Sequence, residues 1–163
     1  MSFIKTDDNV KLFYESIGKG EPIIFVHEFA GNYKSWEPQI NYFSRYYQCI
    51  TFCARGYPPS DVPENESSYS QERAWRDILS VMDNLKIEKA HIVGLSMGGF
   101  ATLHLGMNAQ DRVLSLVIAG CGYGAIPTDI TTFNKEADFS NISLDSAKII
   151  LNEGMDKFGS EYA

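Results

Sequence analysis

A serine flanked by glycines lies between a buried-strand pattern and a helical pattern, in the segment HIVGLSMGGF that begins at residue 91. Gly94-Leu95-Ser96-Met97-Gly98 has the spacing G-x-S-x-G, and Gly99 follows directly. A strand that turns straight into a helix leaves such a serine on a strained backbone, with its hydroxyl clear of the sheet. Side chains at Gly94 or Gly98 would collide across that turn, and Gly99 lets the helix lie close to the sheet. The pattern therefore indicates a nucleophilic serine; the alternative is a glycine-rich turn with an idle serine.

The nucleophile needs supporting groups of two kinds. The backbone N–H of Met97, at the start of the predicted helix, would face negative charge that develops beside Ser96. A serine hydroxyl also needs a base and an acid that orients the base. The chain has three histidines, His27, His91 and His104. His91 stands at the far end of the strand, about 15 Å from Ser96, and His104 about 12 Å along the helix. Neither is expected to reach the hydroxyl.

The elements that position Ser96 follow from the hydrophobic pattern. Alternating segments predict a hairpin, continuous apolar runs predict buried strands, and spacings of three and four predict helices. Strands are expected at 2–6, 11–18, 22–28, 49–54, 89–96 and 112–121. Helices are expected at 35–47, 69–85 and 97–107, with Ser70 as a helix cap. Alternating strands and helices predict an α/β fold, with a mostly parallel sheet, helices on both faces and an N-terminal hairpin.

With these motifs in place, the sequence resembles the α/β-hydrolase family. The segment VHEFAGNYKSW is similar to the family's His-Gly-x-x-Gly loop: His27 and Gly31 match, whereas Glu28 stands where glycine is usual. The resemblance implies that His27 shapes this loop. It also implies that the backbone N–H of Phe29 is the second donor of an oxyanion hole, beside that of Met97.

A second segment, FCARGYPPSD, resembles the family's Asp-x-Arg-Gly-x-Gly-x-Ser motif. Arg55 and Ser60 match, whereas Cys53 replaces the usual Asp and Pro58 a glycine. The resemblance implies a structural role, with Arg55 holding loops by hydrogen bonds. It extends from Phe3 to about residue 123 and is closest to small cytoplasmic carboxylesterases with a helical cap.

The resemblance also implies a division of the chain. Residues 1–123 are expected to form the N-terminal part of the hydrolase core, and residues 124–163 the start of a helical cap. The α/β-hydrolase fold is expected to be incomplete, because the family's last strands, with the triad acid and histidine, would follow. Three explanations compete: a truncated piece or one chain of a pair, a naturally short protein without hydrolytic activity, or an enzyme that borrows a base from another subunit. An apolar edge strand at VLSLVIAG would favour self-association or pairing with a complementing C-terminal segment.

Composition excludes other classes of function. The formal net charge of −7 argues against a nucleic-acid partner, because phosphates require Lys and Arg. No apolar run approaches the roughly 20 residues that span a bilayer, so no membrane partner is expected. The three cysteines form no C-x-x-C pair, and neither a metal nor another cofactor is expected. A cytoplasmic location fits unpaired cysteines and the lack of a signal-peptide pattern.

Two functions remain open, with a variant of the first. The first is a serine hydrolase acting on small, apolar esters through Ser96, inactive or very weak as this chain alone. The second is a non-catalytic, hydrolase-like protein that binds a small apolar ligand or a partner. Peroxide-dependent halogenation or perhydrolysis, which some relatives show, would use the same serine.

Overall fold

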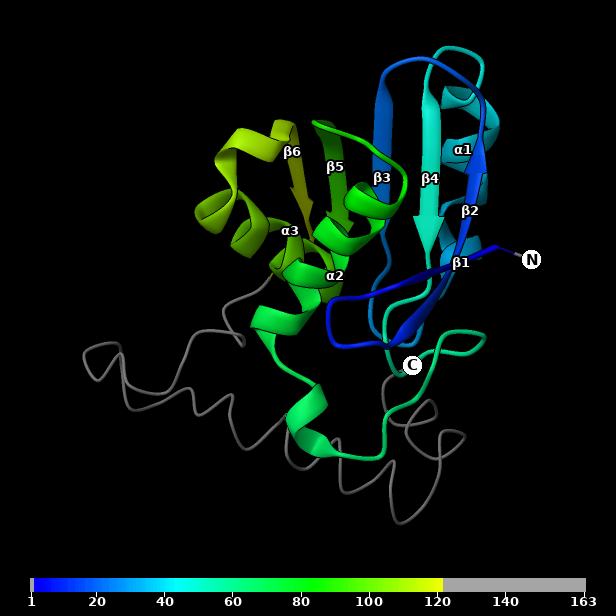
Figure 1. Ribbon diagram of the computed structural model, residues 1–163. Helices are drawn as coiled ribbons and strands as arrows, with labels where there is room; N and C mark the ends of the chain where they lie inside the picture. Colours follow the sequence, from blue (N-terminus) through cyan, green and yellow to red (C-terminus); the bar gives the residue numbers. More distant parts are fainter. Residues whose placement is uncertain (1, 122–163) are drawn as a thin grey trace, which may run out of the picture. The chain divides into compact units, whose positions relative to one another are not determined.

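Six strands form one sheet within residues 2–121, which are the residues that the computed structural model describes. In chain order the strands are β1 (Ser2–Lys5), β2 (Lys11–Ile17), β3 (Pro22–Val26), β4 (Gln48–Phe52), β5 (Ala90–Leu95) and β6 (Val113–Ala119). Their order across the sheet is β1-β2-β4-β3-β5-β6 (Figure 1). β1 and β2 pair antiparallel, as do β2 and β4, and the other neighbours are parallel. The predicted hairpin and mostly parallel sheet are confirmed. The start of a helical cap, predicted for residues 124–163, lies outside the described residues.

Helices cover both faces of this sheet (Figure 1). The helices are α1 (Glu37–Phe43), α2 (Gln71–Asn84) and α3 (Met97–Asn108), with short 3₁₀ helices at Tyr33–Trp36, Glu66–Ser68 and Gln110–Arg112. On one face, Trp36 and Ile40 of the α1 region pack on Ile23 and Phe25 of β3. On the other face, α2 and α3 bury a larger cluster against β3, β4 and β5. The odd and even residues of β3 thus enter different cores, as expected for a strand buried on both sides.

Helix α1 is shorter than the 35–47 predicted from its aromatic spacing. Asn32 caps a 3₁₀ helix, its side chain accepting a hydrogen bond of 2.9 Å from the Lys34 N–H. The α-helix then begins at Glu37 with Pro38 in its first turn, a position where the missing proline N–H costs nothing. The aromatic residues from 42 to 47 therefore divide between a short helix and the turn into β4.

Helix α2 begins where its sequence signal placed it. The Ser70 hydroxyl accepts a hydrogen bond of 3.0 Å from the Arg73 N–H, so Ser70 is the predicted N-cap. Ile78, Val81 and Met82 are fully buried on the side of α2 that faces the sheet. The three-and-four spacing read from the sequence is therefore the packing face.

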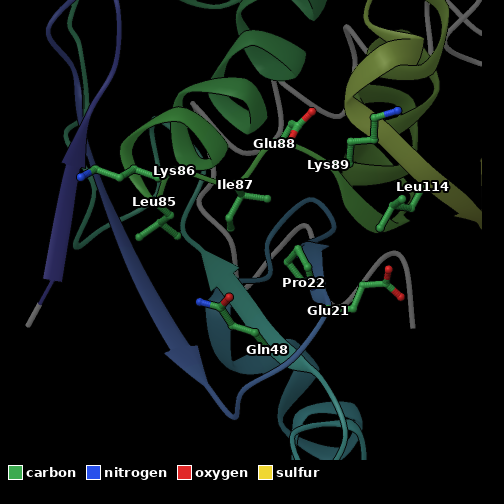
Figure 2. A pocket seen from close by; sticks show the side chains of 9 residues that line it. All are labelled: Glu21, Pro22, Gln48, Leu85, Lys86, Ile87, Glu88, Lys89 and Leu114. Carbon is green, nitrogen blue, oxygen red and sulfur yellow. The ribbon is translucent and has the colours of Figure 1, made fainter.

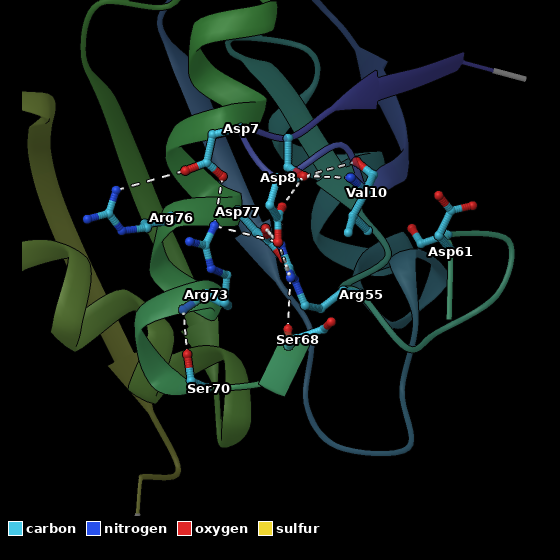
Figure 3. Close-up of polar contacts among 12 residues, drawn as sticks. Asp7, Asp8, Val10, Arg55, Asp61, Ser68, Ser70, Arg73, Arg76 and Asp77 are labelled. Atoms are coloured by element: carbon cyan, nitrogen blue, oxygen red, sulfur yellow. Dashed lines mark hydrogen bonds and ion pairs between the residues drawn. The ribbon is translucent and has the colours of Figure 1, made fainter. Parts of the chain in front are cut away.

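Arg55 connects three separate parts of this fold (Figure 3). The side chain of Arg55 is 5% exposed, and its guanidinium donates two hydrogen bonds to Asp77 of α2, at 2.7 and 2.8 Å. It donates two more to Asp8 in the β1–β2 turn, at 2.8 and 3.0 Å, and one to the Ser68 carbonyl. The loop-holding role that the resemblance implied for Arg55 is confirmed by these contacts.

The Arg55 network makes stability depend on acid pH. Hydrogen bonds from Arg55 hold the pKa of Asp8 below its ordinary value, although burial acts in the opposite direction. A carboxyl with a lowered pKa in the folded state stabilises the fold above its unfolded pKa, about 4 for Asp, and that contribution is lost as pH falls below it. Wild type should therefore exceed Asp8→Asn in unfolding free energy at pH 6, and the difference should shrink below about pH 4. Urea titrations of both proteins between pH 6 and pH 2 measure it. A difference that stays constant over this range would contradict the prediction.

Candidate functional site

Ser96 lies on a sharp bend between β5 and α3. Its backbone has φ 50° and ψ −114°, a conformation that residues other than glycine rarely adopt. The bend is fixed on both sides: the Ser96 N–H donates to the Ala119 carbonyl of β6 at 2.8 Å, and the Ser96 carbonyl accepts from the Phe100 N–H at 3.0 Å. The side chain is half-buried. This strain, held by neighbouring hydrogen bonds, is typical of functional positions.

The three glycines around Ser96 allow backbones to approach closely. A Cβ on Gly94 would collide with the Gly98 carbonyl and the Thr102 hydroxyl. A Cβ on Gly98 would lie 2.6 Å from the Val26 carbonyl carbon and collide with its oxygen, and one on Gly99 would meet the Cys121 sulfur. The absence of side chains at Gly94 and Gly98 thus lets α3 lie against β3 and β5.

Gly98→Ala is expected to destabilise the protein by about 2–3 kcal/mol, because the colliding groups are backbone atoms that cannot move aside. Gly106→Ala, in the same helix, is the matched control. Its new Cβ would meet the end of the Leu116 side chain, which can turn away, and alanine favours helix. Thermal unfolding of both variants measures the difference. Equal stability of the two variants would show that α3 has room beside β3.

The two predicted oxyanion donors lie at a helix start and in a loop. Met97 is the first residue of α3, so its N–H has no partner within the helix. Phe29 follows β3 in the loop that leads to the 3₁₀ helix, and its side chain is 54% exposed. Both residues thus stand after the carboxyl ends of parallel strands, the end of an open α/β sheet where ligands bind.

Glu28 does not need the backbone freedom of the glycine usual at its position. The left-handed residue in this loop is Ala30, with φ 62°. The Gly31 N–H donates to the Glu28 carbonyl at 3.1 Å, which closes a turn around Ala30. The Glu28 carboxylate accepts a hydrogen bond of 3.0 Å from the Ser35 hydroxyl. One oxygen of this carboxylate is therefore hydrogen-bonded within the loop.

His27 holds this loop and has no free ring nitrogen. It is fully buried, and its Nε2 accepts a hydrogen bond from the Ala54 N–H at 3.0 Å. Its Nδ1 must then carry the proton and donate to the Glu28 carbonyl at 2.8 Å. Burial lowers the pKa of His27, which favours this neutral form. These contacts fit a loop-shaping residue and leave no lone pair for a base.

The other two histidines lie away from Ser96, as predicted from spacing. His91 contacts the Ser115 hydroxyl and the Glu21 carboxylate. His104 is half-buried on α3, eight residues beyond Ser96, or about 12 Å along the helix axis. Because the sequence has three histidines in all, this chain brings no free imidazole to Ser96.

A groove of about 470 Å³ lies at the opposite end of the sheet (Figure 2). Pro22 and Gln48, the first residues of β3 and β4, line it, as do Ile87 and Lys89 before β5. Ser96, in contrast, follows the last residue of β5. The groove is therefore a feature separate from the predicted nucleophile, and no motif in the sequence indicated it.

Residues 2–121 contain neither a membrane-spanning helix nor a cluster of metal-binding side chains. No helix there is long and apolar enough to cross a bilayer. No three side chains of His, Cys, Asp or Glu in that range are grouped so that they could hold a metal ion.

Comparison with known proteins places this geometry in a family. The sequence profile of the alpha/beta hydrolase fold matches residues 21–144. The chain is 40% identical over 118 residues to AB hydrolase superfamily protein YisY of Bacillus subtilis, covering 69% of this chain and 43% of that protein. It is 35% identical over 97 residues to 3-oxoadipate enol-lactonase 1 of Acinetobacter baylyi, covering 60% of this chain and 35% of that protein.

A solved structure agrees with these sequence matches. The esterase of Exiguobacterium antarcticum superimposes with a TM-score of 0.70 at 31% identity, over 76% of this chain and 46% of that one. The chain thus spans roughly two fifths of the length of the curated relatives just described. The parallel sheet, the strained serine between β5 and α3, and the profile match agree: this chain belongs to the alpha/beta hydrolase family.

Proposed function

We propose that this chain carries the nucleophile and the oxyanion hole of a serine hydrolase that cleaves small, apolar carboxylic esters. The observation that carries the proposal is the backbone of Ser96, which is strained at φ 50° and stands between β5 and α3. Similarity to an enol-lactonase and to an esterase supports an ester or lactone as substrate. A lactone is a cyclic ester, so one chemistry covers both.

Each residue has one role in the proposed reaction. The Ser96 hydroxyl oxygen attacks the acyl carbonyl, and the N–H groups of Phe29 and Met97 donate hydrogen bonds to the resulting oxyanion. The hydroxyl proton passes to a base outside this chain, because the ring nitrogens of His27 and His91 are engaged and His104 is distant. Turnover by this chain alone should therefore be very low.

Chemical rescue tests the proposal directly. The chain is treated with a fluorophosphonate probe, with and without added imidazole, and the adduct is located by peptide mass spectrometry. Free imidazole replaces the base, so labelling of Ser96 should be slow without it and rise with its concentration. A C-terminal segment that supplies an acid and a histidine should have a larger effect. Ser16, an exposed strand serine, is the internal control and should stay unlabelled.

The alternative function predicts a different result. A non-catalytic, hydrolase-like binding protein would show no adduct at Ser96 under any of these conditions, together with measurable binding of a small apolar ligand. If rescue fails, the hydrogen bonds that already occupy the ring nitrogens of His27 and His91 favour this alternative.

We also propose that β6 pairs with a strand from a complementing C-terminal segment. Among the described residues β6 has one strand neighbour, β5, and its Leu114, Val117 and Ile118 are each at least 39% exposed. Unpaired apolar edge strands promote association, and the relatives are more than twice as long as the matched region. Analytical ultracentrifugation that finds a clean monomer, with and without such a segment, would contradict this.

Three free thiols support a cytoplasmic location for the protein.

A further inference from the structure

A second serine is hydrogen-bonded to a histidine, at the end of the sheet away from Ser96. The β5–β6 register places His91 opposite Ser115, so both side chains stand on the same face. The Ser115 hydroxyl lies 2.7 Å from Nδ1 of His91. The other ring nitrogen, Nε2, lies 3.1 Å from the Glu21 carboxylate, just before β3. Three residues distant in sequence thus form a Ser–His–Glu chain.

The chemistry of Glu21 decides where the proton of His91 lies. An ionised carboxylate can only accept hydrogen bonds, so Nε2 of His91 must carry a hydrogen. In the neutral ring Nδ1 then has the lone pair, and the Ser115 hydroxyl donates to it. This is the protonation state that a general base requires, with the carboxylate placed to stabilise the imidazolium that would form.

The cluster is open to reagents. Ser115 is exposed, and the side chains of His91 and Glu21 are 27% and 55% exposed. The Tyr47 ring packs edge-on against the imidazole, with centroids 6.2 Å apart, and limits its movement. Glu21 also lines the groove of Figure 2. The Ser115 hydroxyl is thus accessible to small reagents and also hydrogen-bonded to an imidazole, unlike a serine whose hydrogen bond is buried in the core.

We propose that Ser115 is a second nucleophilic site, which activated esters and other acyl donors acylate. The Ser115 oxygen bonds to the acyl carbon as its proton passes to Nδ1 of His91, and the bond from that carbon to the leaving alkoxide or phenolate breaks. Glu21 is a positioning residue that keeps the hydrogen on Nε2. This site shares no residue with Ser96 and does not depend on the function proposed for it.

Acetylation by p-nitrophenyl acetate tests the site on the whole chain. Peptide mass spectrometry should find acetyl-Ser115 forming at least about 10-fold faster than acetyl-Ser16, because general-base assistance commonly contributes 100-fold or more. Ser16 is the matched control, since it too is exposed on a strand but accepts a hydrogen bond from the Gln48 amide at 3.0 Å.

Variants separate a reactive cluster from a structural one. His91→Gln should reduce acetylation of Ser115 to the Ser16 level. Glu21→Gln should reduce it about 10-fold or more, because an amide can donate to Nε2 and leave the hydrogen on Nδ1. Glu21→Asp should retain part of the rate. Circular dichroism checks that each variant folds, and Glu21 is exposed enough that its change should not disturb packing.

Three outcomes would overturn the proposal. Ser115 could react no faster than Ser16, its rate could be unchanged in both His91→Gln and Glu21→Gln, or the stable adduct could form on His91 itself. The first two would leave the contact as a cross-strand hydrogen bond, and the third would make the imidazole the nucleophile.

Discussion

Replacing Ser96 with alanine should reduce imidazole-rescued or segment-complemented hydrolysis of p-nitrophenyl butyrate by at least about 10³-fold. Loss of the nucleophile removes the covalent route, and comparable changes in serine hydrolases cost up to about 10⁶. Release of p-nitrophenolate measures the rate. Ser16→Ala changes an exposed residue of β2, three strands from β5, and should leave this rate unaltered. Equal rates in wild type and Ser96→Ala would exclude Ser96 as the nucleophile.

Ser96→Gly distinguishes a strained bend from an ordinary turn. Glycine adopts φ 50° without the penalty that alanine and serine share, and strain of this kind costs roughly 1–3 kcal/mol. After the entropy that glycine adds to the unfolded chain, Ser96→Gly should still be about 1 kcal/mol more stable than Ser96→Ala. Both should be equally inactive. A glycine variant less stable than the alanine variant would contradict the strain.

The largest loss of stability should follow from Arg55→Leu. Asp77 is 2% exposed and accepts two hydrogen bonds from Arg55. Without the guanidinium, a buried carboxylate remains uncompensated, and breaking one partner of such a pair costs about 3–5 kcal/mol. The variant also removes the hydrogen bonds from Arg55 to Asp8, which leaves the β1–β2 turn held to α2 by the more exposed ion pairs of Arg73. Urea unfolding measures the change.

Arg76→Ala is the control for Arg55→Leu. Arg76 is 41% exposed on α2, pairs with Glu72 four residues earlier at 2.9 Å, and lies 3.9 Å from the exposed carboxylate of Asp7. Exposed pairs of this kind are worth less than about 1 kcal/mol, so the variant should be close to wild type. Arg55→Lys should fall between the two, because lysine keeps the charge but cannot donate two parallel hydrogen bonds to a carboxylate. A loss for Arg55→Leu as small as that for Arg76→Ala would mean that the hydrogen bonds from Arg55 to Asp8 and Asp77 add no stability.

Local signals in the sequence were sufficient for the parts of the site that lie close together along the chain. Ser70 as a helix cap and the bend at Ser96 each depend on fewer than about ten neighbouring residues, whose types restrict the backbone directly. The burial of β3 on both faces follows from one continuous apolar run. These features could be predicted because a single element determines each of them.

Features that combine distant residues could not be predicted. Arg55 meets Asp8 and Asp77 only because the sheet order brings the β1–β2 turn beside α2. His91 meets Ser115 only in the observed β5–β6 register, which shifts between Ala90 and His91. Because moving a strand by one residue turns every side chain to the other face, a small register error hides such a pair.

We propose that two backbone amides face the Ser96 hydroxyl while its base comes from outside this chain. A crystal structure of the phosphonylated protein tests it most directly. We predict the phosphonyl oxygen within 2.7–3.1 Å of the amide nitrogens of both Phe29 and Met97, with His27 still bonded to Ala54. A phosphonyl oxygen that points to solvent would contradict the proposed oxyanion hole, and an imidazole of this chain in contact with the Ser96 oxygen would contradict an external base.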